Sequence, residues 1–114
     1  MNVLCHHIYE YKKGVRNLVL HTLSASHKEE AIKKLKASNI DFIVRSVSEQ
    51  KINIFFGKKE CIEVIEQFGD IKLNNLTAEQ DFILGTMLGY SRTQQCERYL
   101  KQKKRQKSSF LSVV

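Results

Sequence analysis

The sequence has few cysteines and no long apolar run, and both absences limit the class of protein that it can encode. Its three cysteines include no C-x-x-C pair, so they form no disulfide framework and suit a reducing compartment. No run of about 18 apolar residues is present, and no basic segment followed by an apolar run stands near the start. We therefore expect a soluble cytoplasmic protein without a signal peptide or a membrane span.

Signatures of catalysis and of cofactor binding are also lacking. The stretch "FFGKKE" has one glycine, whereas a phosphate-binding loop needs a glycine-rich run before its lysine. No cysteine lies in a turn typical of nucleophilic cysteines, and no acid–base pair stands out. We predict a protein that is not an enzyme and that holds no cofactor.

Acidic residues are missing from positions 98–114, and this absence explains the formal net charge of +7. Residues 1–97 carry 13 basic and 12 acidic side chains, so the body of the protein is nearly neutral. A basic C-terminal segment can contact phosphates, an acidic protein such as a flavodoxin, or only water. The candidate contacts to a partner or to nucleic acid are Arg92, Arg98, Lys101, Lys103, Lys104, Arg105 and Lys107.

The pattern of apolar residues predicts one α+β domain, because 114 residues suffice for a single core. A helix is expected over residues 3–13, a strand over 15–23, a helix over 26–39, a hairpin in "DFIVRSVSEQKINIFF", and a helix in "KKECIEVIEQFG". Two more helices follow. This order gives a β-α-β-β-α core, half-ferredoxin-like, with a three-stranded mixed or antiparallel sheet. In that arrangement the third strand lies between the first two and is antiparallel to both.

The boundaries of the domain and of its helices follow from local signals. We assign residues 1–100 to the domain and residues 101–114 to a basic extension, either a helix end or a flexible tail. Three pairs have the spacing of a capping box: Ser26 with Glu29, Thr77 with Gln80, and Ser91 with Gln94.

The first predicted strand has apolar residues on both faces. Leu18 and Val19 are neighbours in the strand and therefore point to opposite faces, so the sheet needs cover on both sides. We expect the N-terminal helix to supply the cover on the second face.

The stretch "CHHIYEYKKG" places a thiol beside two imidazoles and raises the question of a metal or nucleophilic site. Neighbouring side chains on a helix point about 100° apart, whereas ligands on one helix stand three or four residues apart. Cys5, His6 and His7 therefore do not converge, although His21 can approach from the sheet. We predict no metal site, with Cys5 as a small buried residue and the histidines at an interface or on the surface.

The stretch "LGTMLGYSRTQQCERYLK" resembles the helix-turn-helix of bacterial repressors. A small residue, Gly85, is followed four positions later by Gly89, which corresponds to the glycine of the turn. In that motif, apolar side chains one, six and nine positions after the turn glycine hold the second helix against the first. Those positions are Tyr90, Gln95 and Arg98 here, and only the first of them fits.

The apolar residues of the last helix lie one step away from the positions that the motif requires. They are Cys96, Tyr99 and Leu100. One step is a rotation of about 100°, so we expect the helix to present a different face from a DNA reader. Nucleic-acid binding is for this reason the second hypothesis and not the first.

The segment "FILGTMLGY" carries no charge and is apolar around most of a helix. A three-stranded sheet offers limited surface on which to bury it. We predict a homodimer with twofold symmetry that buries this helix or a sheet edge. The candidate interface residues are Phe82, Ile83, Met87 and Tyr90.

Much of residues 5–100 resembles an uncharacterised bacterial family that is catalogued as a domain of unknown function. The resemblance lies in "CHHIYEYKKGVRNLVLHTL", in "FFGKKECIEVIEQF" and above all in "LTAEQDFILGTMLGYSRTQQCERYL". It implies a small homodimeric fold of three strands and five helices. It implies no activity and no site residues.

Two functions follow as hypotheses from these observations. The first is a small homodimeric regulatory or adaptor domain that is not an enzyme and that binds a protein partner, an acidic one being suitable, or a small ligand. The alternative is a nucleic-acid-binding protein that uses the helix-turn-helix-like pair of helices and the basic tail.

Overall fold

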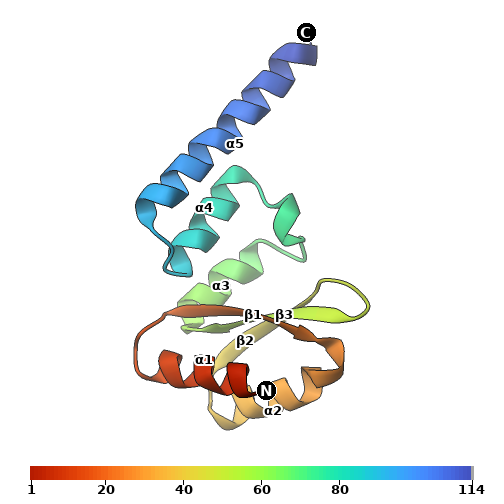
Figure 1. Cartoon of the computed structure of the whole chain (residues 1–114), viewed down its shortest axis with the longest axis vertical. Helices are drawn as coiled ribbons and strands as arrows, with labels where there is room; N and C mark the ends of the chain where they lie inside the picture. Colours follow the sequence, from red (N-terminus) through yellow and green to blue (C-terminus); the bar gives the residue numbers. More distant parts are fainter. Residues whose placement is uncertain (114) are drawn as a thin grey trace. The chain divides into compact units, whose positions relative to one another are not determined.

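The computed structural model describes the backbone of residues 1–113 and the side chains of residues 1–107, which fall into two units (Figure 1). The N-terminal unit, Met1–Asp70, contains α1 (Asn2–Lys12), β1 (Leu18–Ser24), a 3-10 turn (Ala25–His27), α2 (Lys28–Ala37), β2 (Asp41–Ser46), β3 (Lys51–Gly57) and α3 (Lys59–Gln67). The C-terminal unit begins at Ile71 and contains a 3-10 turn (Leu73–Asn75), α4 (Ala78–Met87) and α5 (Arg92–Val113). The predicted α+β architecture is confirmed.

The predicted C-terminal extension is helical where the structure describes it. Helix α5 continues from Arg92 through residue 101 to Val113, and residue 114 lies outside the described part of the chain. That residues 1–100 form a single domain stays a prediction.

The sheet has the strand order β1-β3-β2, and both pairings are antiparallel. This confirms that the third strand lies between the first two. The hairpin between β2 and β3 closes where the Val47 N–H donates to the Lys51 carbonyl at 3.0 Å. Leu18 of β1 and Asp41 of β2 both lie opposite Gly57, so the three strands share one end.

Both faces of the sheet are covered, but not by the helices that we expected. Leu4 and Ile8 of α1 join Ala31 and Leu35 of α2 in one cluster against Val19, Ile52, Ile54 and Phe56. The expectation that α1 covers the second face is therefore wrong: α1 and α2 share a face (Figure 1). The reason is the narrow apolar stripe of α2, which buries only two residues and leaves room for another helix.

Helix α3 covers the opposite face of the sheet (Figure 1). It contributes two buried side chains, Ile62 and Ile65. The strands contribute Leu18, Ile43 and Phe55, which alternate with the residues of the first face. The predicted need for cover on both sides of β1 is confirmed.

The local signals gave some boundaries correctly and missed others. Helix α2 ends at Ala37, inside the predicted range, and Asn39 just beyond it adopts a left-handed conformation with φ 57°, which is common after a helix. The predicted capping box of Ser26 and Glu29 is wrong. Helix α2 begins at Lys28 without a side-chain cap, because Ser24 instead caps a 3-10 turn that precedes it.

Strand β1 begins at Leu18, three residues later than predicted. The chain is still bonded to the end of α1 at Val15, whose N–H donates to the Glu10 carbonyl at 3.2 Å. Among the residues that the structure describes, no helix is both long and apolar enough to cross a membrane.

Candidate functional site

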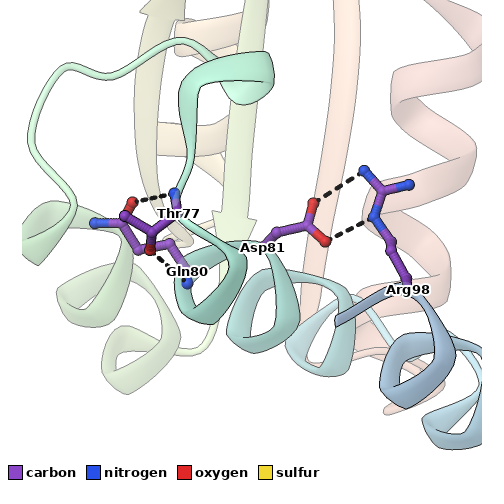
Figure 2. A network of polar contacts seen from close by, with 4 residues as sticks. All are labelled: Thr77, Gln80, Asp81 and Arg98. Atoms are coloured by element: carbon purple, nitrogen blue, oxygen red, sulfur yellow. Dashed lines mark hydrogen bonds and ion pairs between the residues drawn. The ribbon is translucent and has the colours of Figure 1, made fainter. Parts of the chain in front are cut away.

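Helices α4 and α5 form a hairpin whose start is fixed by a capping box, as the sequence predicted. The Gln80 N–H donates to Thr77 Oγ1 at 3.1 Å, and the Thr77 N–H donates to Gln80 Oε1 at 3.0 Å (Figure 2). The second predicted cap is formed in part, because the Gln94 N–H donates to Ser91 Oγ at 3.4 Å. Between the helices Gly89 adopts φ 85°, which reverses the chain without steric cost.

The two helices are in tight contact at Gly85 and Gln95. Both residues are buried, and a Cβ placed on Gly85 would overlap the side-chain amide of Gln95. The predicted rotation of α5 is wrong for two of its three residues: Gln95 faces α4, while Cys96 and Leu100 are exposed. The third, Tyr99, does pack on α4. The missing Cβ of Gly85 makes room for a long polar side chain where we expected an apolar one.

Polar pairs and one aromatic pair hold the hairpin along the whole of α4. Arg98 donates from Nε and Nη2 to the two carboxylate oxygens of Asp81, at 2.6 and 3.2 Å (Figure 2). Two residues nearer the start of α4, a carboxylate oxygen of Glu79 lies 3.1 Å from Lys103 Nζ. The ring centroids of Phe82, beside Asp81, and of Tyr99, beside Arg98, are 5.8 Å apart.

This antiparallel arrangement differs from a helix-turn-helix of the repressor type. In that motif the two helices cross at about 90–120°, so they meet only near the turn. Here the contact persists from Gly85 beside the turn to Glu79 at the far end of α4. The two helices lie side by side over their shared length (Figure 1).

Two of the seven candidate cations are thus engaged within the hairpin. The hydrogen bond that Arg98 donates to Asp81 raises the pKa of Arg98, and the hydrogen bond that Lys103 donates to Glu79 raises the pKa of Lys103. Both effects favour the charged form of the basic partner. Arg98 and Lys103 are therefore positioning groups of the hairpin as well as sources of positive charge.

The other five cations are exposed and form no ion pair with any side chain that the structure describes. They are Arg92, Lys101, Lys104, Arg105 and Lys107. Lys101 stands three and four residues before Lys104 and Arg105, so these three share one side of α5. Lys101 and Arg105 line one hollow together with Gln95 and Arg98, so this side of α5 borders the residues that face α4.

An exposed leucine lies among these cations. Leu100 has 61% of its surface exposed, although it is a large apolar side chain. Lys104 and Lys107 stand four and seven residues after it, on the same side of α5. We call the surface formed by Leu100, Lys101, Lys104, Arg105 and Lys107 the basic face. Glu97 borders it one turn before Lys101 and is the nearest acidic residue in sequence.

The predicted dimer residues on α4 separate into two groups. Phe82 is half-buried against Tyr99 and belongs to the hairpin. Ile83 and Tyr90 are exposed, and Met87 is half-buried on the same side of α4 as Ile83, four residues away. The apolar surface available to a second chain on α4 is therefore smaller than the sequence indicated.

The cysteine and histidines near the start of the chain do not form a cluster of three ligands. Within residues 1–107, no group of three His, Cys, Asp or Glu side chains is placed to hold a metal ion. The prediction that Cys5 is buried is wrong, because it lies about 100° around α1 from the buried Leu4 and is exposed. His6 is exposed and lies 2.9 Å from Glu10.

The sheet does bring His21 to His7, as considered from the sequence. Their ring centroids are 5.2 Å apart, and His7 Nδ1 is buried without a hydrogen-bond partner among the described residues. Burial lowers the pKa of both imidazoles. The Arg16 charge lowers the pKa of His7 further, and the neighbouring His7 does the same for His21. The pair is thus a neutral contact between α1 and β1.

Comparison with known proteins identifies a family but no characterised relative. No curated protein matches the chain. The model of a family described as protein of unknown function (DUF2023) matches residues 2–102. The three strands and five α-helices of the described residues also agree with the fold that the resemblance implied. The chain therefore belongs to the DUF2023 family.

Proposed function

We propose that this protein is a small homodimeric adaptor or regulatory domain, without enzymatic activity, that binds an acidic protein through the basic face of α5. We place it in the cytoplasm of a bacterium, since its three cysteines are free and the family resemblance is to bacterial proteins. The observation that carries the proposal is the exposed Leu100 among cations that α4 does not neutralise.

The basic face combines the two features that a protein partner requires. Its cations attract an acidic surface and raise the association rate, while an apolar anchor is desolvated in the complex and slows dissociation. Charge supports the same surface. The C-terminal unit has eight basic and three acidic residues, a net charge of +5, against +2 for the N-terminal unit with 11 and nine.

Nucleic-acid binding is the second candidate, and one observation favours it. Gln95 and Arg98 face α4, as the inward positions of a helix-turn-helix do. Against it, the basic face contains Leu100 and is bordered by Glu97, which would approach phosphates with the wrong charge. An acidic protein with an apolar spot fits this surface better than a phosphate backbone does.

The experiment measures association with two probes, a flavodoxin as the acidic protein and a duplex DNA of 20 base pairs. The test variant is Lys101→Gln/Lys104→Gln/Arg105→Gln. The matched control, Lys33→Gln/Lys34→Gln/Lys36→Gln on α2, loses the same charge from a different helix. We expect the test variant to lower the association rate with the flavodoxin about tenfold and the control to lower it much less.

A third variant, Leu100→Ala, separates the apolar anchor from the charge. It should raise the dissociation rate of the flavodoxin complex and leave the association rate unchanged. Equal effects of the test and control triple variants would contradict the proposal. Sequence-specific DNA binding at physiological salt, lost on Arg92→Gln, would establish the alternative.

A further inference from the structure

The outer edge of β1 carries backbone groups whose direction follows from two hydrogen bonds. Just outside the strand, the Lys58 N–H donates to the Asn17 carbonyl at 2.9 Å, and the Ala25 N–H donates to the Gln50 carbonyl at 2.8 Å. In an antiparallel pair the bonded residues alternate, so the odd-numbered residues of β1 bond to β3. The N–H and C=O groups of the even-numbered residues point outward.

Three of these outward residues are open to a partner. Leu18 has no exposed surface, whereas Leu20, Thr22 and Ser24 are half-buried or exposed. The N–H and C=O groups of Leu20 and Thr22 and the N–H of Ser24 bond to no described residue. The Ser24 carbonyl is used by the 3-10 turn that it caps. The strand "LVLHTLS" also contains no Lys, Arg, Asp, Glu or Pro, the residues with which proteins usually protect an edge.

The other edge of the sheet is protected. The Val47 N–H donates to the Lys51 carbonyl, so the odd-numbered residues of β2 bond to β3. The backbone groups of Val44 therefore point outward. There the guanidinium of Arg45 donates to the Val44 carbonyl at 3.3 Å. Arg45 also lies 3.9 Å from Asp70, and β2 begins with the charged Asp41. A second strand that approached β2 would have to displace these groups.

From this asymmetry we infer that β1 pairs antiparallel with β1 of a second copy of the chain, around a twofold axis at Thr22. The inference rests on the proposed homodimeric state and names its interface. In this register Leu20 bonds to Ser24 of the second copy, Thr22 bonds to its own counterpart, and Ser24 bonds to Leu20. Two hydrogen bonds between the Thr22 residues and one from each Ser24 N–H to the Leu20 carbonyl of the other copy give about four hydrogen bonds and one continuous antiparallel sheet.

A second copy fits this edge better than an unrelated peptide because β1 is complementary to itself. Across the axis Thr22 meets Thr22, and His21 lies beside Leu23, so no like charges face one another. An apolar residue adds to the contact from α1: Val3 is 58% exposed and lies one turn before His7, which packs on His21.

The first test places like charges on the axis. Thr22→Lys is compared with Thr22→Val, which also loses the 2.5 Å hydrogen bond from Thr22 to Asn53 but introduces no charge. Ser46→Lys places the same charge on β2. Light scattering across concentrations should show a dimer for the natural sequence, for Thr22→Val and for Ser46→Lys. The dissociation constant of Thr22→Lys should rise at least tenfold.

The second test does not depend on how well Thr22→Lys folds. In a chain with Cys5→Ser, Cys61→Ala and Cys96→Ser, a cysteine is introduced either as Thr22→Cys or as Ser46→Cys. A short bis-maleimide should join two Thr22→Cys chains quickly and join Ser46→Cys chains only slowly. The opposite order would contradict the inference.

The outcomes also separate this inference from the function proposed above. A dimer that ignores Thr22→Lys but dissociates on Ile83→Lys would move the interface to α4 and leave the homodimer in place. A monomeric natural sequence would contradict the homodimeric state itself. Binding of the flavodoxin by the basic face is measured independently in each variant.

Discussion

Different interactions stabilise the interior of each of the two units of this protein. The N-terminal unit encloses an apolar cluster with Leu4, Val19, Leu35, Ile54 and Phe56 fully buried. The C-terminal hairpin is held instead by a glycine–glutamine contact, two ion pairs and one aromatic pair. Apolar burial depends little on salt, whereas exposed ion pairs are weak and screened. The sheet is thus the stable part, and the hairpin is the part that responds to its surroundings.

The largest effect should come from emptying the apolar cluster. Phe56 has no exposed surface and makes an edge contact with the ring of Tyr11, with centroids 6.2 Å apart. Phe56→Ala should lower the free energy of unfolding by about 3–5 kcal/mol. Urea unfolding followed by circular dichroism measures it. Tyr90→Ala, at an exposed aromatic residue of the other unit, should change it by less than about 0.5 kcal/mol.

A smaller effect is expected at the contact between Gly85 and Gln95 of the hairpin. Gly85→Ala places a methyl group against the buried amide of Gln95 and should lower the stability of the hairpin by about 1–3 kcal/mol. The double variant Gly85→Ala/Gln95→Ala removes the overlap. It should recover stability, since alanine favours a helix over glycine by about 1 kcal/mol. Amide hydrogen exchange in α4 measures both, and an additive loss would contradict the contact.

Removing an ion pair of the hairpin should cost less still. Asp81→Asn removes the negative charge that holds Arg98, which is itself 58% exposed in its side chain. We expect a loss of about 0.5–1 kcal/mol at low salt that shrinks in 1 M NaCl. The control is Asp70→Asn, because Asp70 is 88% exposed and lies 3.9 Å from Arg45. A loss for Asp81→Asn that does not depend on salt would show that charge is not its cause.

The smallest effect should come from pH and should fall on the N-terminal unit. The pKa values of His7 and His21 lie below the ordinary value of about 6.5, chiefly because both rings are partly buried. The unfolded chain therefore binds more protons than the folded one just below that value. Stability should be full above pH 6.5 and should fall as the pH drops through 6.5 towards the folded pKa values.

Two variants assign this pH dependence. His21→Phe keeps a ring against His7 but removes one of the two titrating groups, so the decrease between pH 7 and pH 5 should become shallower. His27→Asn changes an exposed histidine of the 3-10 turn and should keep the full decrease. Urea unfolding at the two pH values measures both. An unchanged decrease in His21→Phe would exclude the histidine pair as its source.

The parts of the fold that the sequence predicted depend on short-range patterns. The β-branched runs and the short polar link gave the hairpin of β2 and β3, and Thr77 with Gln80 gave the start of α4. Such signals are read within a few residues, so no tertiary contact is needed to interpret them. The face on which α1 packs was missed because an amphipathic stripe shows that a helix is buried but not on which side.

The orientation of α5 was missed for a different reason. Counting apolar residues favoured Cys96, Tyr99 and Leu100 as the inward positions, and only Tyr99 packs on α4. The actual rotation places Arg98 beside Asp81 and Lys103 beside Glu79. These partners are 17 and 24 residues apart in the sequence. Because Gly85 has no side chain, Gln95 fits against α4, and in this rotation Arg98 and Lys103 reach their acidic partners. The signal available in the sequence was the presence of two acidic residues before the turn, Glu79 and Asp81, and of basic residues after it.

The free cysteines divide between the two units in a useful way. Cys5 in α1 and Cys96 in α5 are both exposed, whereas Cys61 in α3 is half-buried and its pKa is raised chiefly by burial. Because the thiolate is the form that reacts, Cys61 is the slowest of the three towards a maleimide. Mild labelling therefore attaches one probe to each unit of the natural sequence. A donor and an acceptor fluorophore at these two thiols would report the separation of sheet and hairpin, and any change in it when a partner binds.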